Sequence, residues 1–194
     1  MKSIVISPDL ELKEVRIEDA AVTFALIEKN RDYLREFLPW LDNVRDVEDS
    51  ENNIRFAIQQ AANMQGTHYS IWYRGQLAGR VAANFIEWNH RKTVIGYWLG
   101  AEFQGKGIMT QAVEAYVDYL VFGKWNLHRV EIAAAVQNEK SRAIPERLGF
   151  QLEGIIRGNE WLYDHYVDHA VYGMLQQEWK QRKKRGKLGV PFYN

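Results

Sequence analysis

Hydrophobic and polar residues alternate near the start of the chain and then change to a helical period. Residues 4–6 and 10–15 are predicted to be extended, because apolar and charged residues alternate in the second segment. Apolar residues at spacings of three and four then predict three helices. These helices span residues 20–29, 31–38 and 47–64. Asp19 is suited to cap the first helix, and Pro39 ends the second.

From His68 onward the pattern is typical of strands. An antiparallel meander is predicted over residues 69–73, 77–85 and 93–99, with a turn at Arg74-Gly75. A helix begins near Met109, and a strand, a short helix and two strands follow it. The later strands span residues 130–136, 150–155 and 166–175, and the short helix runs from an Asn138 cap to about Gly149. Without repeats or interior linkers, this order predicts one α/β (α+β) domain over residues 1–179.

The segment from Gly96 to Gln111 has the pattern of a strand, a glycine turn and a helix. The first turn of a helix has NH groups without partners and the positive end of the helix dipole, so it suits an anion such as phosphate. Gly105 and Gly107 would let the backbone approach such a group closely. Two common phosphate motifs are excluded, since Thr110 replaces a required glycine and no Ser or Thr follows Lys106. A plain strand-to-helix connection remains the alternative.

Composition narrows the class of protein. The chain has 194 residues, of which 46% are hydrophobic, so we expect a globular domain with a substantial core. No apolar run approaches 18 residues and no basic-then-apolar leader is visible, so we expect no membrane span or signal peptide and a cytoplasmic location. The absence of cysteine excludes disulfides, thiolate metal sites and a cysteine nucleophile.

The formal net charge of zero hides an uneven distribution. Residues 1–179 contain 19 of the 25 basic residues and all 25 acidic ones. This acidic body would attract a cationic substrate and disfavours general nucleic-acid binding. The basic residues of the predicted C-terminal tail, residues 180–194, are either a solvated end or a contact for RNA or an acidic partner. A homodimer is also left open.

The glycine segment resembles a known family. Residues 104–109, Gln-Gly-Lys-Gly-Ile-Met, resemble the Gln/Arg-x-x-Gly-x-Gly/Ala signature of the GCN5-related N-acetyltransferases (GNAT), whose backbone amides hold the pyrophosphate of acetyl-CoA. Met109 replaces the small final residue, so we expect its side chain to point away from the cofactor. The resemblance is closest to the RimL-type branch, which acetylates N-terminal amines of ribosomal proteins. The matching segments are Ile-Gly-Tyr-Trp-Leu at 95–99, Gln-Gly-Lys-Gly-Ile at 104–108, Asn-Glu-Lys-Ser at 138–141, Leu-Gly-Phe at 148–150 and Leu-Glu-Gly at 152–154.

This resemblance implies a mixed, mostly antiparallel sheet flanked by helices, with acetyl-CoA as donor substrate and no metal. It also implies that a backbone NH within residues 97–100 polarises the thioester carbonyl. The cofactor-binding residues that it implies are Trp98, Leu99, Gly100, Gln104, Gly105, Lys106, Gly107, Ile108, Met109, Thr110, Asn138 and Ser141.

An acetyl acceptor must be an unprotonated amine. An α-amine has a pKa of about 8 and a lysine about 10.4, so deprotonating the lysine costs roughly 3 kcal/mol more. Glu160 matches the glutamate that RimL-type enzymes use as a base, and a carboxylate could act through an ordered water. Its alternative is an exposed charge in the loop between the last two strands. Glu153 is a rival base, or simply a residue at the end of a strand.

Ser141 matches the serine that the RimL-type branch places near the cofactor sulfur as a proton donor. Many relatives use a tyrosine seven residues after the asparagine, where this chain has Pro145, so the role falls to Ser141 or to water. Capping by Asn138 and Ser141 is the structural alternative. Pro145 also predicts a short or distorted helix.

The remaining histidines and aromatic residues give weaker signals. His165 and His169 are four residues apart but would be well separated on a strand, and no third ligand is obvious, so no metal site is predicted. Phe37 and Trp40 lie where this family covers its acceptor groove, although most aromatic residues belong to a core. His68, His90 and His128 are assigned to the surface or to satisfied hydrogen bonds.

The predicted function is acetyl transfer from acetyl-CoA directly to an amine, with the N-terminal amine of a ribosomal protein as the preferred acceptor. A small amine, such as a polyamine, an antibiotic or an amino-nucleoside, is the second possibility. A non-catalytic acyl-CoA-binding module is the third, and Ser141 with Glu160 beside the loop argues against it.

Overall fold

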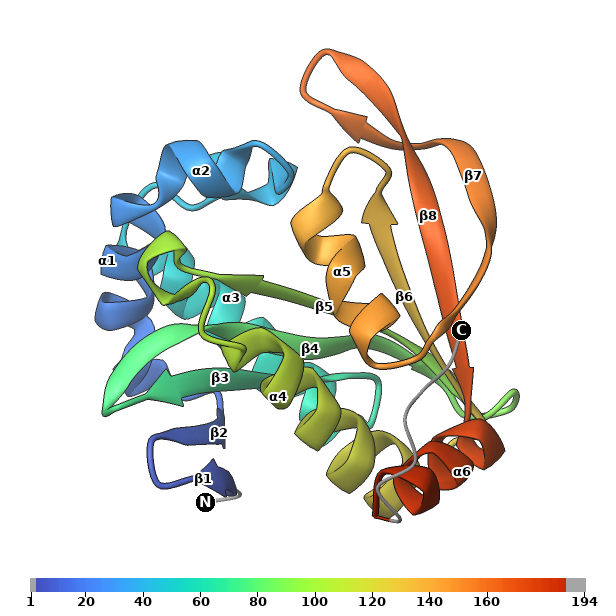
Figure 1. The fold of residues 1–194 in the computed structure, drawn as a ribbon. Coiled ribbons are helices and arrows are strands. Elements are labelled where there is room, and N and C mark those ends of the chain that lie inside the picture. Colours follow the sequence, from blue (N-terminus) through green and yellow to red (C-terminus); the bar gives the residue numbers. More distant parts are fainter. Residues whose placement is uncertain (1–2, 188–194) are drawn as a thin grey trace.

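An eight-stranded sheet carries the fold in the computed structural model, which describes residues 3–187 (Figure 1). The strand order is β1-β2-β3-β4-β5-β6-β8-β7, and every neighbouring pair is antiparallel except β5 and β6. The strands are β1 (Ser3–Ser7), β2 (Leu10–Glu14), β3 (Thr67–Tyr73), β4 (Gln76–Glu87), β5 (Lys92–Leu99), β6 (Arg129–Ala135), β7 (Gln151–Leu162) and β8 (His165–Leu175). This is the mixed, mostly antiparallel sheet that the sequence predicted.

The sheet opens between β5 and β6. The two strands pair in parallel only where Lys92 faces Arg129, Thr93 faces Val130 and Val94 faces Glu131. Beyond that point β5 stays with β4 and β6 stays with β8, so the second halves of β5 and β6 diverge (Figure 1). A strand edge with unpaired backbone groups therefore lies in the middle of the sheet rather than at its rim.

Helices cover both faces of the sheet. Helices α1 and α3 contact strands β4 and β3, respectively, on one face, whereas α4 crosses the other face (Figure 1). The helices are α1 (Ala20–Lys29), α2 (Arg31–Arg35), α3 (Val47–Ala62), α4 (Ile108–Tyr116), α5 (Glu139–Arg147) and α6 (Gln176–Lys187). Short 3-10 turns span Ile17–Asp19, Pro39–Asn43 and Ala101–Phe103, and α4 continues into π-helical turns over Val117–Lys124. None of the helices in residues 3–187 is long and apolar enough to cross a bilayer.

One buried side chain shows how the layers are joined. Tyr116 at the end of α4 is fully buried, and its hydroxyl donates to the carbonyl oxygen of Thr67 at 3.0 Å. The same hydroxyl accepts the NH of Ala83 at 2.9 Å. These bonds fix α4 against β3 and β4, and α4 in turn holds the glycine turn at its N-terminus.

The last two strands differ from the prediction. Strand β7 continues to Leu162, whereas the sequence predicted an end at residue 155. The polar run of residues 157–160 hid the strand because β7 is exposed along most of its length and has register shifts against β8. Glu160 is consequently part of a strand, opposite Val167, and does not lie in a loop.

The basic C-terminal segment also differs from the prediction of a solvated tail. Residues 180–187 continue α6, which docks through Trp179, only 1% exposed. Arg182 pairs with Glu114 at 2.8 Å and Lys183 with Asp118 at 2.8 Å, both acids lying on the α4 side of the molecule. Acidic partners far away in sequence therefore neutralise part of the positive charge of this segment. Composition alone could not show these ion pairs. Residues 188–194 of the predicted tail lie outside the described part of the chain.

Candidate functional site

The glycine turn adopts a backbone conformation that glycine favours. Gly105 and Gly107 have φ angles of +72° and +69°, and Gly107 is the N-cap of α4. A Cβ at Gly105 would meet nothing within 4 Å, so the requirement for glycine is conformational rather than steric. The turn delivers the NH groups at the start of α4, beginning with Ile108, to one point. It is therefore suited to bind an anion.

A cavity of about 940 Å³, here called the loop cavity, lies over this turn. Its wall comes from α2, the end of β5, the glycine turn and α5. Of the predicted cofactor residues it contains Trp98, Leu99, Gln104, Gly105, Gly107, Ile108, Met109, Thr110, Asn138 and Ser141. Gly100 and Lys106 are not in its wall; Lys106 Nζ instead donates to the carbonyl oxygen of Glu102 at 2.8 Å.

Helix α5 adds two cations to the loop cavity. Arg147 donates from Nε to the hydroxyl of Thr110 at 3.2 Å, and Lys140 donates from Nζ to Gln104 Oε1 at 3.3 Å. Gln104 is in turn hydrogen-bonded to the hydroxyl of Tyr33. Neither Arg147 nor Tyr33 lies within a recognisable sequence motif. Only the packing of α5 and α2 against the turn reveals them.

Met109 is 6% exposed and belongs to the main hydrophobic core, although it also borders the loop cavity. Its side chain therefore contributes to the packing of α4, and its orientation away from a cofactor stays a prediction. A larger residue is accommodated here because the core behind α4 takes up its volume.

A second cavity, of about 500 Å³, lies over strands β3 to β6 beneath α1 and α3 and is here called the sheet cavity. It shares residues with the loop cavity at the point where β5 and β6 diverge. The shared residues are Phe37, Leu38, Tyr97, Trp98, Asn138 and Ser141. The two cavities are therefore two arms of one cleft that meet beside Trp98 and Ser141.

The backbone of β5 presents a donor at this junction. Gly100 NH is already bonded to the carbonyl of Ala78 on β4 at 2.8 Å. Because successive NH groups of a strand point to opposite sides, that of Leu99 is directed to the side where β6 has diverged. Within the predicted segment 97–100, the NH groups of Tyr97 and Leu99 therefore point to that side, and Leu99 is the nearer of the two to the glycine turn.

Ser141 lies where α5 approaches β5. Its NH donates to Asn138 Oδ1 at 3.0 Å, which confirms the capping interaction, and its carbonyl oxygen accepts the hydroxyl of Tyr97 at 2.9 Å. Burial raises the pKa of Tyr97 well above its usual value. The Ser141 side chain also hydrogen-bonds with the Tyr97 hydroxyl, which opposes this rise in the pKa, and Ser141 lines both cavities. Helix α5 is short and contains Pro145, as predicted.

Glu160 enters the sheet cavity together with His169. Glu160 Oε2 lies 3.1 Å from His169 Nε2, and the other ring nitrogen, Nδ1, lies 3.1 Å from the side-chain amide nitrogen of Asn159. The amide donates to Nδ1, which assigns the ring proton to Nε2, facing the carboxylate. The sequence pattern around His169 gave no indication of this contact with Glu160. Across residues 3–187 no cluster of residues is suited to a metal ion.

Glu153, the rival base, is engaged elsewhere. Its carboxylate forms a two-pronged contact with Arg129, with Arg129 Nη1 2.6 Å from Oε1. The hydrogen bonds from Arg129 lower the pKa of Glu153. Glu153 lines neither the loop cavity nor the sheet cavity, so the geometry favours Glu160.

The inner wall of the sheet cavity contains Arg80 and a hydrogen-bonded histidine, His68. His68 Nε2 lies 3.1 Å from Gln60 Oε1, and burial, with Arg80 nearby, lowers the pKa of His68 to about 4. Phe37 and Trp40 also line this cavity, and the ring of Trp40 lies 6.4 Å from that of Trp98. Both aromatic residues therefore lie at the sheet cavity, and their role in covering an acceptor stays a prediction.

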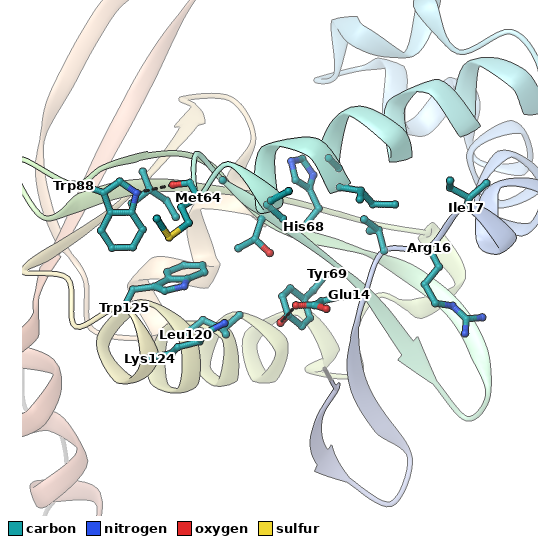
Figure 2. A pocket seen from close by; sticks show the side chains of 18 of the residues that line it. Glu14, Arg16, Ile17, Met64, His68, Tyr69, Trp88, Leu120, Lys124 and Trp125 are labelled. Atoms are coloured by element: carbon teal, nitrogen blue, oxygen red, sulfur yellow. Dashed lines mark hydrogen bonds between the residues drawn. The ribbon is translucent and has the colours of Figure 1, made fainter. Parts of the chain in front are cut away.

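A third cavity, of about 570 Å³, opens on another side of β3 and is called the lateral cavity (Figure 2). It lies between β2, α3 and the π-helical turns, and its rim includes Trp88, whose Nε1 donates to the carbonyl oxygen of Met64 at 2.6 Å. It shares His68 with the sheet cavity but contains none of the predicted site residues. In Figure 2 the His68 ring lies beside α3, away from the lower part of this cavity.

Comparison with known proteins agrees with this geometry. The family model described as an acetyltransferase (GNAT) domain matches residues 9–151. Among curated relatives, the putative ribosomal N-acetyltransferase YdaF of Bacillus subtilis (strain 168) is 34% identical over 92% of this chain and 97% of its own length. The ribosomal-protein-serine acetyltransferase of Escherichia coli (strain K12) is 30% identical over 90% of this chain and 97% of its own.

Solved structures lead to the same conclusion. The ribosomal-protein α-N-acetyltransferase RimL in complex with coenzyme A has a TM-score of 0.88 at 28% identity, covering 91% of this chain and 99% of that one. The microcin self-immunity acetyltransferase MccE in complex with acetyl-CoA and AMP has a TM-score of 0.84 at 30% identity, covering 88% and 94%. The chain belongs to the acetyltransferase (GNAT) family and is an N-acetyltransferase whose donor is acetyl-CoA.

Proposed function

We propose that this enzyme transfers the acetyl group directly to the N-terminal α-amine of a ribosomal protein. The observation that carries the proposal is the meeting of the two cavities, because Glu160 lines the same sheet cavity as Trp98 and Ser141, which also line the loop cavity. Two relatives at 34% and 30% identity have names that refer to ribosomal proteins. The predicted cytoplasmic location belongs to the same proposal.

In the loop cavity, the NH groups at the start of α4 are proposed to hold the pyrophosphate of acetyl-CoA, with Arg147 and Lys140 supplying positive charge. The NH of Leu99 then polarises the thioester carbonyl, since it faces the opening between β5 and β6. Charge that develops on the carbonyl oxygen during attack is stabilised by such a fixed donor.

The proton transfers are assigned to the junction and to the sheet cavity. The amine nitrogen attacks the carbonyl carbon, the carbon–sulfur bond breaks, and the thiolate takes a proton from the Ser141 hydroxyl, which recovers one from solvent water. Glu160, held by His169 at 3.1 Å, accepts the proton that the amine loses, through an ordered water. No covalent enzyme intermediate is needed in this scheme.

An α-amine suits this site better than a lysine. Its pKa of about 8 leaves a useful unprotonated fraction near neutral pH, whereas a lysine needs roughly 3 kcal/mol more for deprotonation. One partly exposed carboxylate, whose side chain is 36% accessible, supports the smaller task more easily than the larger one.

The test is a panel of peptides that carry the N-terminal sequences of ribosomal proteins. Release of the CoA thiol and mass spectrometry of the product should place one acetyl group on the α-nitrogen. As a matched control, each peptide is also made with a blocked α-amine and a free lysine, and we expect no turnover of these. Acetylation of lysine, or failure of all free peptides, would overturn the proposed acceptor.

A small amine is the second candidate acceptor. The sheet cavity is about 500 Å³ and is covered by α1 and α3, a size and shape typical of small-molecule sites. Polyamines and amino-nucleosides therefore belong in the same panel, and turnover of these compounds alone would favour this second candidate.

A further inference from the structure

The inner wall of the sheet cavity contains an arginine without a partner. Arg80 on β4 stands opposite Trp98 on β5 in the strand register and lines the sheet cavity. Within residues 3–187 its guanidinium makes no hydrogen bond and no ion pair. Other arginines are engaged: Arg129 holds Glu153 and Glu131, and Arg35 holds Asp42. Arginines that are withdrawn from water are normally paired in this way.

The charge on Arg80 is not neutralised by its surroundings. Burial lowers the pKa of Arg80 to about 10, so the side chain stays protonated at neutral pH. The neighbouring His68 is uncharged there, since its pKa is lowered to about 4 and it bonds to Gln60 on α3. The other titratable groups facing the cavity are Tyr97, His169 and Glu160, and Glu160 contacts His169 rather than Arg80. One wall is therefore cationic, while the other carries a carboxylate.

Two hydroxyl groups in the same region are also without partners. Thr23 on α1 and Ser50 on α3 are 3% and 2% exposed, both line the sheet cavity, and neither hydroxyl has a hydrogen-bond partner in the described chain. Buried hydroxyls are normally hydrogen-bonded. The cationic wall thus retains hydrogen-bonding capacity that no described protein group uses.

We propose that this wall binds an anionic group of the acceptor, a carboxylate or a phosphate, through Arg80. The acceptor is then held as a dipolar molecule, with its amine at Glu160 and its anion at Arg80. This inference rests on the proposed function and narrows it, because in a peptide the anion would be an acidic side chain near the N-terminus.

The strand geometry limits where that side chain lies. Arg80 is one strand away from Trp98, a separation of about 4.8 Å, and an extended peptide advances roughly 3.3 Å per residue. With acetyl transfer placed beside Trp98, where the two cavities meet, the acidic residue is then at the first or second position of the acceptor. Peptide and small-molecule acceptors share this chemistry, and the experiment separates them.

Paired peptides test the inference directly. Peptides that differ only by aspartate or asparagine, at position one or at position two, are compared by kcat/KM. For wild-type enzyme we expect the acidic member of at least one pair to be favoured by about 10-fold or more, mainly through KM, as for a charge-assisted hydrogen bond. In Arg80→Met the two members should differ by less than about 2-fold, and Arg80→Lys should keep part of the preference.

Two controls separate recognition from damage to the fold. Arg80 does not line the loop cavity, so CoA affinity measured by calorimetry should show that Arg80→Met is folded. Arg74→Met removes an exposed arginine that pairs with Asp9 at the β3–β4 turn, and it should retain the wild-type preference. An equal preference in wild type, or a preference that survives Arg80→Met, would overturn the inference.

The anion site can also be tested if the enzyme acetylates no peptide. If no peptide is acetylated and small amines are, the same comparison is made between an amino carboxylate and its carboxamide. A preference for the carboxylate that is lost in Arg80→Met would support the anion site and replace the peptide with a small molecule. The absence of a preference there would overturn the anion site.

Discussion

The loop cavity and the sheet cavity meet at Trp98 and Ser141, but different kinds of chemical group line them. Most of the chemistry of the loop cavity comes from backbone groups of one continuous stretch, the glycine turn and the start of α4. The sheet cavity depends on side chains from distant segments, among them Arg80 on β4 and Glu160 on β7. The first arrangement is determined mainly by backbone conformation, whereas the second can be altered by substituting single side chains.

The largest effect on turnover is expected from a side chain of the sheet cavity, Glu160. Glu160→Gln keeps the shape of the sheet cavity but removes the group proposed to take the proton of the amine. We expect kcat to fall by about 100-fold at pH 7, in the usual range for a lost general base. The loss should shrink as pH rises toward the pKa of the amine, because the acceptor then deprotonates without help. A pH–rate profile identical in shape to that of wild type would remove Glu160 from this role.

The role of the backbone in the loop cavity is tested by adding one methyl group to the glycine turn. Gly107→Ala places a residue with a Cβ at φ +69°, at a cost of about 1–2 kcal/mol, and should weaken CoA binding by roughly 10-fold. Gly75→Ala is the matched control, since Gly75 has φ +73° in the β3–β4 turn, outside all three cavities. It should lose similar stability yet bind CoA normally. Equal CoA affinities in the two variants would contradict the role of the turn.

The junction itself is tested through Ser141. Ser141→Ala removes the hydroxyl but leaves the backbone contacts to Asn138 and Tyr97 intact. We expect kcat to fall by about 10-fold, at the low end of acid–base effects since water can replace the hydroxyl, while CoA affinity stays nearly constant. Wild-type turnover, or a loss seen only in CoA affinity, would assign Ser141 to binding or to capping instead.

The smallest effect should come from the cations of α5. Arg147→Met removes a charge from the loop cavity and should weaken CoA binding by about 3-fold to 5-fold, because an exposed charge pair contributes only up to about 1 kcal/mol. The difference from wild type should decrease at high salt, since the Debye length shortens. A salt-independent loss would show that Arg147 acts through packing rather than through charge.

The difference between the two cavities explains which site residues could be predicted from the sequence. The glycine turn, the strand before it and Asn138 with Ser141 form local patterns, and the structure places all of them around one cavity. Arg80 and Arg147 lie outside such patterns, because no neighbouring residue in the sequence marks either of them. Their positions depend on strand register and on the docking of α5, which only the fold determines.

Two elements show why the remaining boundaries were missed. Strand β7 is exposed along most of its length, so it lacks the apolar alternation that predicts a strand and was ended too early. Helix α6 has a basic sequence that resembles a solvated tail, but Trp179 is buried and Arg182 contacts Glu114, a residue of α4. For β7 the pairing with the adjacent strand β8 overrides the local pattern, and for α6 partners distant in sequence do so.

The central claim is that donor and acceptor meet between Ser141 and Glu160. A bisubstrate compound that joins the CoA sulfur, through an acetyl bridge, to the α-nitrogen of an acceptor peptide tests this most directly. In a crystal structure of the complex, we predict the pyrophosphate at Gly105 and Gly107, the bridge beside Ser141, and the peptide in the sheet cavity. A peptide seated in the lateral cavity of Figure 2, or a bridge remote from Ser141 and Glu160, would contradict the account.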